Sequence, residues 1–313
     1  MRPINSRFLL IALLGVTLGC GTLPAWSATH QGKSHVVRKH KAHKHPPKKH
    51  VHKAMLEESS NLRLSSNAAM VLDQSTGAVL FEKNAGAVLP IASITKLMTA
   101  MVALDAQPNL DETLMIDEDD VDLLKGTHSR LKVGTRLSRE DMLRLALMSS
   151  ENRAASALSR HYPGDRPAFI AAMNRKAQAL GLQDTQFFDP TGLTARNVSS
   201  ARDLAKMVSA AQRYPLIRQF TTTSEYDVEV GGRVQAFRNT NSLVRSSSWD
   251  IGLSKTGYIN EAGRCLVMQA WFNKKPTIIV LLDSLGKMTR LGDANRIKHW
   301  VENNAVAQRQ SAG

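Results

Sequence analysis

Apolar and polar positions change their spacing twice along this chain of 313 residues. Residues 68–72 and 78–82 are short apolar runs on either side of the turn-rich segment 73–77, which predicts a β-hairpin. From about Ser224 onward, the sequence again consists of short apolar runs separated by turn residues. The strands expected there cover residues 226–230, 234–237, 252–256, 265–272 and 277–283.

Between these two groups of strands, apolar residues recur at the spacing of an α-helix. Pro90 precedes the first such stretch, and its apolar stripe ends before Pro108. Ser138 and Asp141 form a capping-box pattern that begins a second helix, which ends close to Ser149. Further helices are expected over residues 167–180 and 200–212, and a last one carries Ile297, Trp300 and Val301.

Strands at both ends of the chain with helices between them predict an α/β fold with one antiparallel sheet. Both termini would contribute strands to that sheet, and a helical subdomain would be inserted between them. The hydrophobic content of 42% is enough for a core. We expect the folded domain at residues 61–303, followed by a flexible C-terminal tail at residues 304–313.

The first residues have the pattern of a secretory signal peptide. Two arginines precede an apolar run at residues 8–18, and small residues occupy positions 25 and 27, which a signal peptidase reads. We therefore expect a signal peptide at residues 1–27 and a periplasmic protein. A lipoprotein signal with lipidation at Cys20 is the alternative. A permanent membrane helix would need about 20 apolar residues, which is longer than this run.

Most of the positive charge of the chain, +14 in total, follows the signal. Residues 30–53 hold eight Lys or Arg, no acidic residue and seven of the ten histidines. Such a segment has too little apolar surface to fold, so we expect residues 28–60 to be disordered. Three uses remain open: contact with anionic envelope components, metal binding by the imidazoles, or a solubilising linker. The export signal disfavours nucleic-acid binding.

Two other features have plain structural interpretations. Cys265 is the only cysteine that remains after removal of the signal, and its apolar neighbours predict a buried packing residue. The acidic run at residues 117–122 lacks the glycine and the alternate spacing of a calcium-binding loop. We expect it to be a solvated surface segment.

Three short motifs occur in order along the chain: Ser93-Ile94-Thr95-Lys96, Ser150-Glu151-Asn152 and Lys255-Thr256-Gly257. None is informative alone, because the first spacing recurs by chance, for example from Ser129 to Lys132. In this order, they are typical of an acyl-transfer site with a serine nucleophile. Their predicted positions are a helix start, a connection between two helices, and a strand.

The first motif pairs a nucleophile with a base. If Ser93 begins a helix, Lys96 lies one turn later on the same face, and its amine can approach the Ser93 hydroxyl. A lysine acts as a base only when it is neutral, and burial together with the nearby cation of Lys255 would lower its pKa. The plainer interpretation is a helix cap with an exposed lysine, but Ile94 and Leu97 favour an apolar setting.

The second motif would face the same cleft from its loop. Ser150 would relay a proton to the leaving amine, and the amide of Asn152 would hold either the substrate or Lys96. Taken alone, Ser150 is equally well explained as a helix cap.

The third motif would bind a substrate carboxylate, with positive charge from Lys255 and a hydroxyl from Thr256. Gly257 would leave space for a substrate along the strand edge. The backbone N–H of Tyr258 would complete an oxyanion hole. The plainer interpretation is the end of a surface strand.

The residues around the motifs resemble the serine D-alanyl-D-alanine peptidases among the low-molecular-mass penicillin-binding proteins, most of all the endopeptidase members. The resemblance implies a serine β-lactamase/transpeptidase-like fold, peptidoglycan as substrate, β-lactam antibiotics as covalent inhibitors, and no cofactor or metal. It covers roughly residues 62–303. The segments that carry it are Pro-Ile-Ala-Ser-Ile-Thr-Lys-Leu-Met-Thr at 90–99, Ser-Ser-Glu-Asn-Arg-Ala-Ala at 149–155, Pro-Thr-Gly-Leu at 190–193 and Arg-Asn-Thr-Asn at 238–241.

The resemblance leads to one hypothesis and three alternatives. The hypothesis is a penicillin-sensitive endopeptidase that hydrolyses D-alanyl-meso-diaminopimelate cross-links through an acyl-enzyme on Ser93. Its alternatives are a carboxypeptidase that removes terminal D-alanine, a β-lactamase, and a non-catalytic envelope-binding protein. A class A β-lactamase needs a deacylating glutamate, and the region around residues 189–192 lacks the Glu-x-x-Leu-Asn pattern. The intact motifs disfavour a protein without activity.

Two departures from the family pattern qualify the resemblance. The better-known carboxypeptidase relatives carry a second, β-rich domain and a C-terminal amphipathic anchor, and we expect neither in this chain. Glu151 stands where many relatives have aspartate, which leaves the functional groups of Ser150 and Asn152 unchanged.

Overall fold

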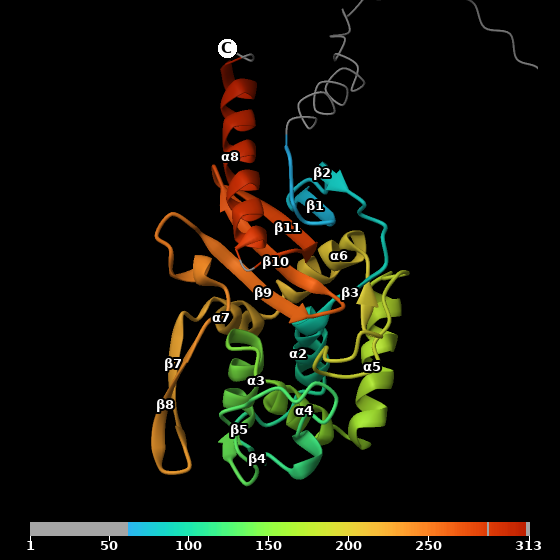
Figure 1. Cartoon of the computed structure of the whole chain (residues 1–313), viewed down its shortest axis with the longest axis vertical. Coiled ribbons are helices and arrows are strands. Elements are labelled where there is room, and N and C mark those ends of the chain that lie inside the picture. The colour runs from blue at the N-terminus through green and yellow to red at the C-terminus, as the bar shows by residue number, and fades with distance from the viewer. Residues whose placement is uncertain (1–61, 287, 311–313) are drawn as a thin grey trace, which may run out of the picture. The chain divides into compact units, whose positions relative to one another are not determined.

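A computed structural model describes residues 62–286 and 288–310, coloured from blue to red in Figure 1. The signal peptide expected at residues 1–27 and the basic segment expected at residues 28–60 lie outside the described residues. In the described part, strands from both of its ends meet in one sheet, the sequence between them forms most of the helices, and a last helix follows the final strand.

A five-stranded sheet in the order β2-β1-β11-β10-β9 forms the centre of the fold. Strand β1 pairs with β11, so that Ala68 lies opposite Leu282, and all neighbouring strands are antiparallel. This confirms the predicted sheet built from both ends of the domain. Its strands are β1 (Ala68–Asp73), β2 (Val79–Lys83), β9 (Ile251–Ile259), β10 (Gly263–Phe272) and β11 (Lys275–Ser284).

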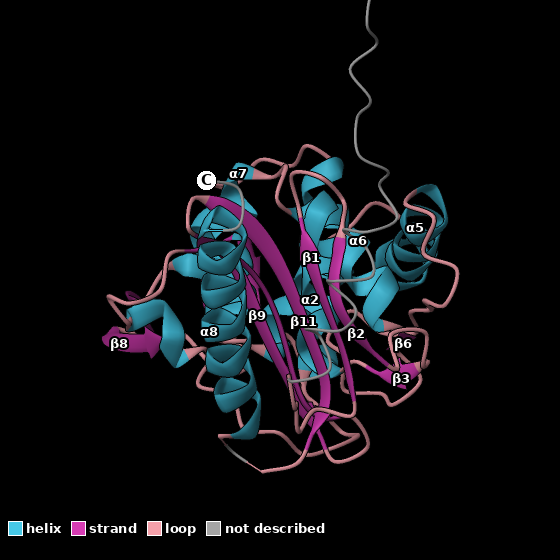
Figure 2. Ribbon diagram, turned by 90° about the horizontal axis from the view of Figure 1, so that it is seen from above, coloured by secondary structure: helices cyan, strands magenta, loops and turns pink. Residues whose placement is uncertain are grey.

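Both faces of the sheet are covered by helices. Met70 of β1 packs into the core shared with the helical region, whereas its neighbour Val71 packs with Ile297 of the last helix. The run at 68–72 is therefore apolar at every position rather than at every second one. Cys265 is buried in the first of these cores, as expected. Figure 2 shows α8 (Thr289–Gln310) over one face of the sheet and α2 (Thr95–Asp105) and α6 (Ala201–Ala211) behind it.

The inserted helices pack around α2, whose residues from Thr95 to Ala103 are all buried. Ser138 accepts a hydrogen bond from the Asp141 N–H and begins α3, as the capping-box pattern predicts. Two further helices, α4 and α7, have weak sequence signals because α4 is rich in small residues and α7 is short. The remaining bounds are α3 (Arg139–Met148), α4 (Asn152–Arg160), α5 (Asp165–Ala179) and α7 (Pro215–Thr222). Within residues 62–286 and 288–310, no helix is long and apolar enough to cross a membrane.

Three parts of the fold differ from the prediction. Among the described strands, β7 (Glu225–Val230) and β8 (Arg233–Arg238) pair only with each other and do not join the main sheet. The tail expected from residue 304 is helical as far as Gln310, because the sequence after Gly292 contains no proline or glycine until Gly313. Two short strand pairs were not expected: β3 (Leu89–Pro90) with β6 (Val198–Ser199), and β4 (Thr113–Met115) with β5 (Arg136–Ser138).

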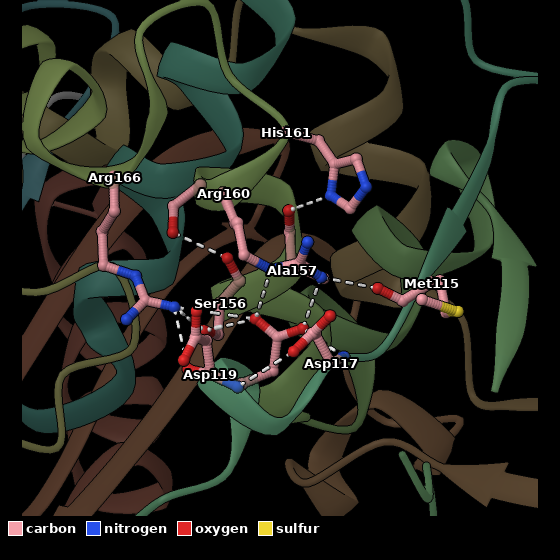
Figure 3. A network of polar contacts seen from close by, with 10 residues as sticks. Met115, Asp117, Asp119, Ser156, Ala157, Arg160, His161 and Arg166 are labelled. Carbon is pink, nitrogen blue, oxygen red and sulfur yellow. Dashed lines mark hydrogen bonds and ion pairs between the residues drawn. The ribbon is translucent and has the colours of Figure 1, made fainter. Parts of the chain in front are cut away.

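One member of the acidic run at residues 117–122 is not solvated. Asp120, in the 3-10 turn η2 (Glu118–Asp120), has a fully buried side chain that accepts hydrogen bonds from Ser156 and Arg160, both at 2.8 Å. Arg166 joins this network through Ser156 at 2.7 Å (Figure 3). The expectation of a solvated segment is wrong here, because one carboxylate balances arginines of both α4 and α5.

In the described part of the chain, no group of three or more His, Cys, Asp or Glu residues is placed to hold a metal ion.

We predict that Asp120→Ala lowers the free energy of unfolding by about 2–4 kcal/mol, because it leaves two partly buried guanidinium groups without their carboxylate. Asp119→Ala is the matched control, since Asp119 contributes only backbone groups to this network. Urea unfolding followed by circular dichroism measures both variants. An equal loss of stability in the two would contradict the role assigned to Asp120.

Candidate active site

The three sequence motifs meet between the helical region and the edge of the sheet. Ser93 lies in the 3-10 turn η1 (Ala92–Ile94), directly before α2. Lys96 is in the first turn of α2, and its Nζ donates a hydrogen bond to Ser93 Oγ at 2.8 Å. Ala92 has a φ of +47°, a strained conformation for a residue with a Cβ. The hydroxyl and the amine are thus held together, as the helical spacing predicts.

The amine of Lys96 is fully buried and has three hydrogen-bond acceptors. Besides Ser93, these are Asn152 Oδ1 at 2.8 Å and the backbone carbonyl of Thr191 at 2.7 Å. Burial lowers the pKa of Lys96 to about 7, and two nearby carboxylates act in the opposite direction. Burial, one of the two causes expected from the sequence, is the main cause, and the second expected cause, the charge of Lys255, is not among the main contributions. A large fraction of this lysine is therefore neutral near pH 7.

The second motif lies in the connection between α3 and α4, as predicted. Ser150 has a left-handed backbone with a φ of +63°, and its Oγ accepts a hydrogen bond from Lys255 Nζ at 2.9 Å. Asn152 begins α4, and its Nδ2 donates to Thr127 Oγ1 at 3.0 Å while its Oδ1 faces Lys96. Of the two partners that the sequence left open for this amide, the structure shows Lys96.

The third motif lies on β9, which is the edge strand of the sheet. Lys255 and Thr256 are both buried, and the Lys255 amine also donates to the Thr256 carbonyl at 2.9 Å. Burial lowers the pKa of Lys255 well below its ordinary value, and the charges of Lys96 and Arg290 lower it further. The Thr256 hydroxyl donates to Thr240 Oγ1 at 2.6 Å. The site therefore contains two buried lysines, Lys96 beside Ser93 and Lys255 beside Ser150.

Two glycines let neighbouring segments approach the backbone around Ser93. A Cβ at Gly257 would lie 3.0 Å from the Ser93 nitrogen and 2.9 Å from the Ile91 carbonyl oxygen. Gly192 has a φ of +84°, and a Cβ there would lie 2.0 Å from the Ala92 carbonyl oxygen. A side chain at position 257 would therefore meet the segment that carries Ser93, and the space for a substrate along the strand edge stays a prediction. Because both positions are glycine, strand β9 and the loop that carries Gly192 can lie directly against the backbone around Ser93.

Tyr258, expected to contribute a backbone N–H to an oxyanion hole, follows Gly257 on the same edge. The residue is 51% exposed, and the guanidinium carbon of Arg264 lies 4.4 Å from the centre of its ring. The side chain therefore faces solvent. The oxyanion role stays a prediction.

Several groups of the site were not identified from the sequence. The carbonyl of Thr191 belongs to the loop at residues 189–194, and Asp189 holds this loop by accepting backbone hydrogen bonds from it. Arg290, in the first turn of α8, donates to the carbonyls of Gly257 at 3.0 Å and Cys265 at 3.2 Å. A backbone carbonyl has no sequence signature, and neither has a single arginine near a helix start. The one sequence signal for this loop is the Pro-Thr-Gly-Leu segment at residues 190–193, which carries part of the family resemblance.

Comparisons with known proteins identify relatives over most of the chain. A family model described as D-alanyl-D-alanine carboxypeptidase matches residues 54–286. A D-alanyl-D-alanine endopeptidase of Pseudomonas aeruginosa is 50% identical over 245 residues, which cover 78% of this chain and 79% of that protein. A D-alanyl-D-alanine endopeptidase of Escherichia coli is 48% identical over 250 residues, which cover 79% of this chain and 81% of that protein.

Solved structures show the same fold. The Streptomyces K15 DD-transpeptidase has a TM-score of 0.70 at 30% identity, and the match covers 76% of this chain and 97% of that chain. Penicillin-binding protein D2 from Listeria monocytogenes, in a cefotaxime-bound form, has a TM-score of 0.68 at 30% identity, with 77% of this chain and 98% of that chain covered. The transpeptidase-like fold expected from the sequence is therefore confirmed. The chain belongs to the D-alanyl-D-alanine carboxypeptidase family and is a serine-type D-alanyl-D-alanine peptidase.

Proposed function

We propose that this enzyme is a periplasmic endopeptidase that hydrolyses the D-alanyl-meso-diaminopimelate cross-links of peptidoglycan. The observation that carries the proposal is the buried pair of Ser93 and Lys96, in which a lysine with a pKa of about 7 is hydrogen-bonded to the serine hydroxyl. The choice of a cross-link over a terminal D-alanine is supported by the two relatives named endopeptidases. The periplasmic location is supported by the signal-peptide pattern at residues 1–27.

In the proposed acylation, neutral Lys96 accepts the proton of the Ser93 hydroxyl while Oγ attacks the carbonyl carbon of the D-alanine residue. The negative oxygen of the tetrahedral intermediate is stabilised by the backbone N–H groups of Ser93 and Tyr258. The proton taken up by Lys96 passes through Ser150 to the leaving amine, and the C–N bond breaks. An ester on Ser93 remains, and Lys96 is neutral again for its hydrolysis by water.

The leaving amine belongs to a residue that carries a carboxylate beside it. The Lys255 amine supplies N–H donors and Thr256 a hydroxyl at the edge of the site where that carboxylate would bind. Asn152 is held between Lys96 and Thr127, so its amide positions the base. These roles account for all three motifs.

Digestion of purified cross-linked muropeptide dimers tests the proposal. We expect the wild-type enzyme to convert dimers to monomers, and Ser93→Ala to be slower by at least about 10³-fold, because it lacks the nucleophile. Liquid chromatography with mass spectrometry identifies the products. Intact dimers alongside pentapeptides that lose their terminal alanine would instead identify a carboxypeptidase.

The rate of acylation by a fluorescent penicillin should rise with pH from about 6 and level off above about 8, because the neutral fraction of Lys96 grows as the pH passes its pKa of about 7. An unperturbed lysine, with a pKa of 10.5, would give a rate that still rises at pH 9. Lys96→Arg, which stays cationic, should lose acylation by about 10³-fold or more. Continued increase of the wild-type rate beyond pH 9 would show that the base is a different group.

The penicillin adduct should persist. The loop at residues 189–194 contains no glutamate, and it offers Lys96 only a backbone carbonyl. The opened β-lactam also keeps its leaving amine attached, so that the amine occupies the place that a hydrolytic water needs. Intact-protein mass spectrometry should detect the adduct on wild type, and not on Ser93→Ala, over hours. Rapid turnover of a chromogenic cephalosporin would indicate a β-lactamase instead.

A further inference from the structure

An open cavity of about 930 Å³ lies between the loop that precedes β5 and the tip of the β7–β8 hairpin. Four basic residues line it, Arg130, Lys132, Arg136 and Arg233, with Glu229 as the acidic residue among the lining side chains. All four basic side chains are exposed. Three of them, excluding Arg130, form no ion pair with a carboxylate of the described residues. We call this cavity the basic groove.

The two walls of the basic groove are fastened to each other. Arg130 Nη1 donates to the Ala236 carbonyl at 2.6 Å, and its guanidinium carbon lies 3.6 Å from the centre of the Phe237 ring. This contact joins the loop to β8 at one end of the groove. Val133, which also lines the groove, is 41% exposed and adds an apolar surface next to the cations. The groove therefore combines positive charge with a place for small apolar groups.

The basic groove begins beside the second motif. Arg130 Nε lies 4.0 Å from Glu151 Oε1, and Ser129 Oγ donates to Glu151 Oε2 at 2.7 Å. Glu151 directly follows Ser150, the residue that we assign to the leaving amine. One wall of the groove is thus linked to the proton relay.

The other wall is linked to the third motif. Strand β8 ends two residues before Thr240, which accepts the hydrogen bond of the Thr256 hydroxyl. The backbone N–H of Thr240 donates to the Met148 carbonyl at 3.1 Å, which fixes this connection to the end of α3. Both walls of the groove therefore extend from residues on the leaving-group side of Ser93.

We propose that the basic groove binds the peptide attached to the leaving amine, a stem peptide that carries free carboxylates. This inference rests on the proposed function. The leaving group of a carboxypeptidase is a single D-alanine, which ends at its carboxylate. The leaving group of an endopeptidase continues into a second, anionic peptide with alanine methyl groups, which matches the charge and the apolar surface of the groove. The groove thus favours cross-links over terminal D-alanine.

Charge reversal tests the groove without changing the site around Ser93. In Arg136→Glu/Arg233→Glu, kcat/KM for cross-linked dimers should fall about tenfold at low ionic strength, and the difference from wild type should shrink as salt is added. Acylation by penicillin should stay within about twofold of wild type, because the two reversals leave the residues hydrogen-bonded around Ser93 unchanged. Thermal unfolding confirms that the variant is folded.

The matched control reverses two exposed arginines elsewhere. Arg63 lies just before β1, and Arg175 lies on α5, which Figures 1 and 2 show on the other side of the molecule from the β7–β8 hairpin. Arg63→Glu/Arg175→Glu should cleave dimers at the wild-type rate. A loss equal to that of the groove variant would show that net charge alone matters, and would overturn the inference.

Two other results would overturn it: unchanged dimer cleavage in the groove variant, or an equal loss of dimer cleavage and penicillin acylation. A wild-type enzyme that reacts with penicillin but leaves dimers intact refutes the proposed function instead. The groove is then tested by calorimetric titration of Ser93→Ala with an uncross-linked tetrapeptide stem, with and without the two reversals. Weaker binding after reversal supports the groove as a peptide site, and equal or absent binding overturns it.

Discussion

The hydrogen bonds of one buried amine tie together the parts of the molecule that form the site. Removing an amine from water requires other polar groups to replace its hydration. For Lys96 these groups come from three separate segments: the turn before α2 with Ser93, the start of α4 with Asn152, and the loop with Thr191. No carboxylate of the described residues pairs with this lysine at ion-pair distance. Burial of the Lys96 amine therefore has two effects. It requires all three segments to stay in place as acceptors, and it lowers the pKa of the amine.

Close backbone contact is the second requirement of this arrangement. Gly192 and Gly257 lie against the backbone around Ser93 from two sides, where any larger residue would collide with main-chain atoms that cannot move aside. Arg290 fixes the outer side of the Gly257 segment through two carbonyls. The position of the serine is thus set by main-chain packing more than by side chains.

Local patterns predicted most of the elements and the members of the site, because their signals lie within a few residues of each other. The cap at Ser138, the hairpin at its predicted turn and the spacing of Ser93 and Lys96 are of this kind. Contacts between distant segments have no such signal. The burial of Asp120 depends on arginines that lie far along the chain, and the carbonyl of Thr191 is independent of its side chain. Strands β7 and β8 resemble sheet strands in sequence, but which partners they take is decided by the rest of the fold.

The pairing of β1 with β11 also determines when the site is complete. Ala68 and Leu282 are neighbours in the sheet but lie near opposite ends of the domain, so this contact closes a very long loop and forms late in folding. During synthesis, β1 leaves the ribosome long before its partner exists, and its apolar residues stay unpaired in the meantime. Lys255 reaches Ser150 only after β9 has been made. A nascent or partly folded chain therefore contains Ser93 but not the surroundings that make it reactive, and the hydrolase becomes active only once its sheet has closed.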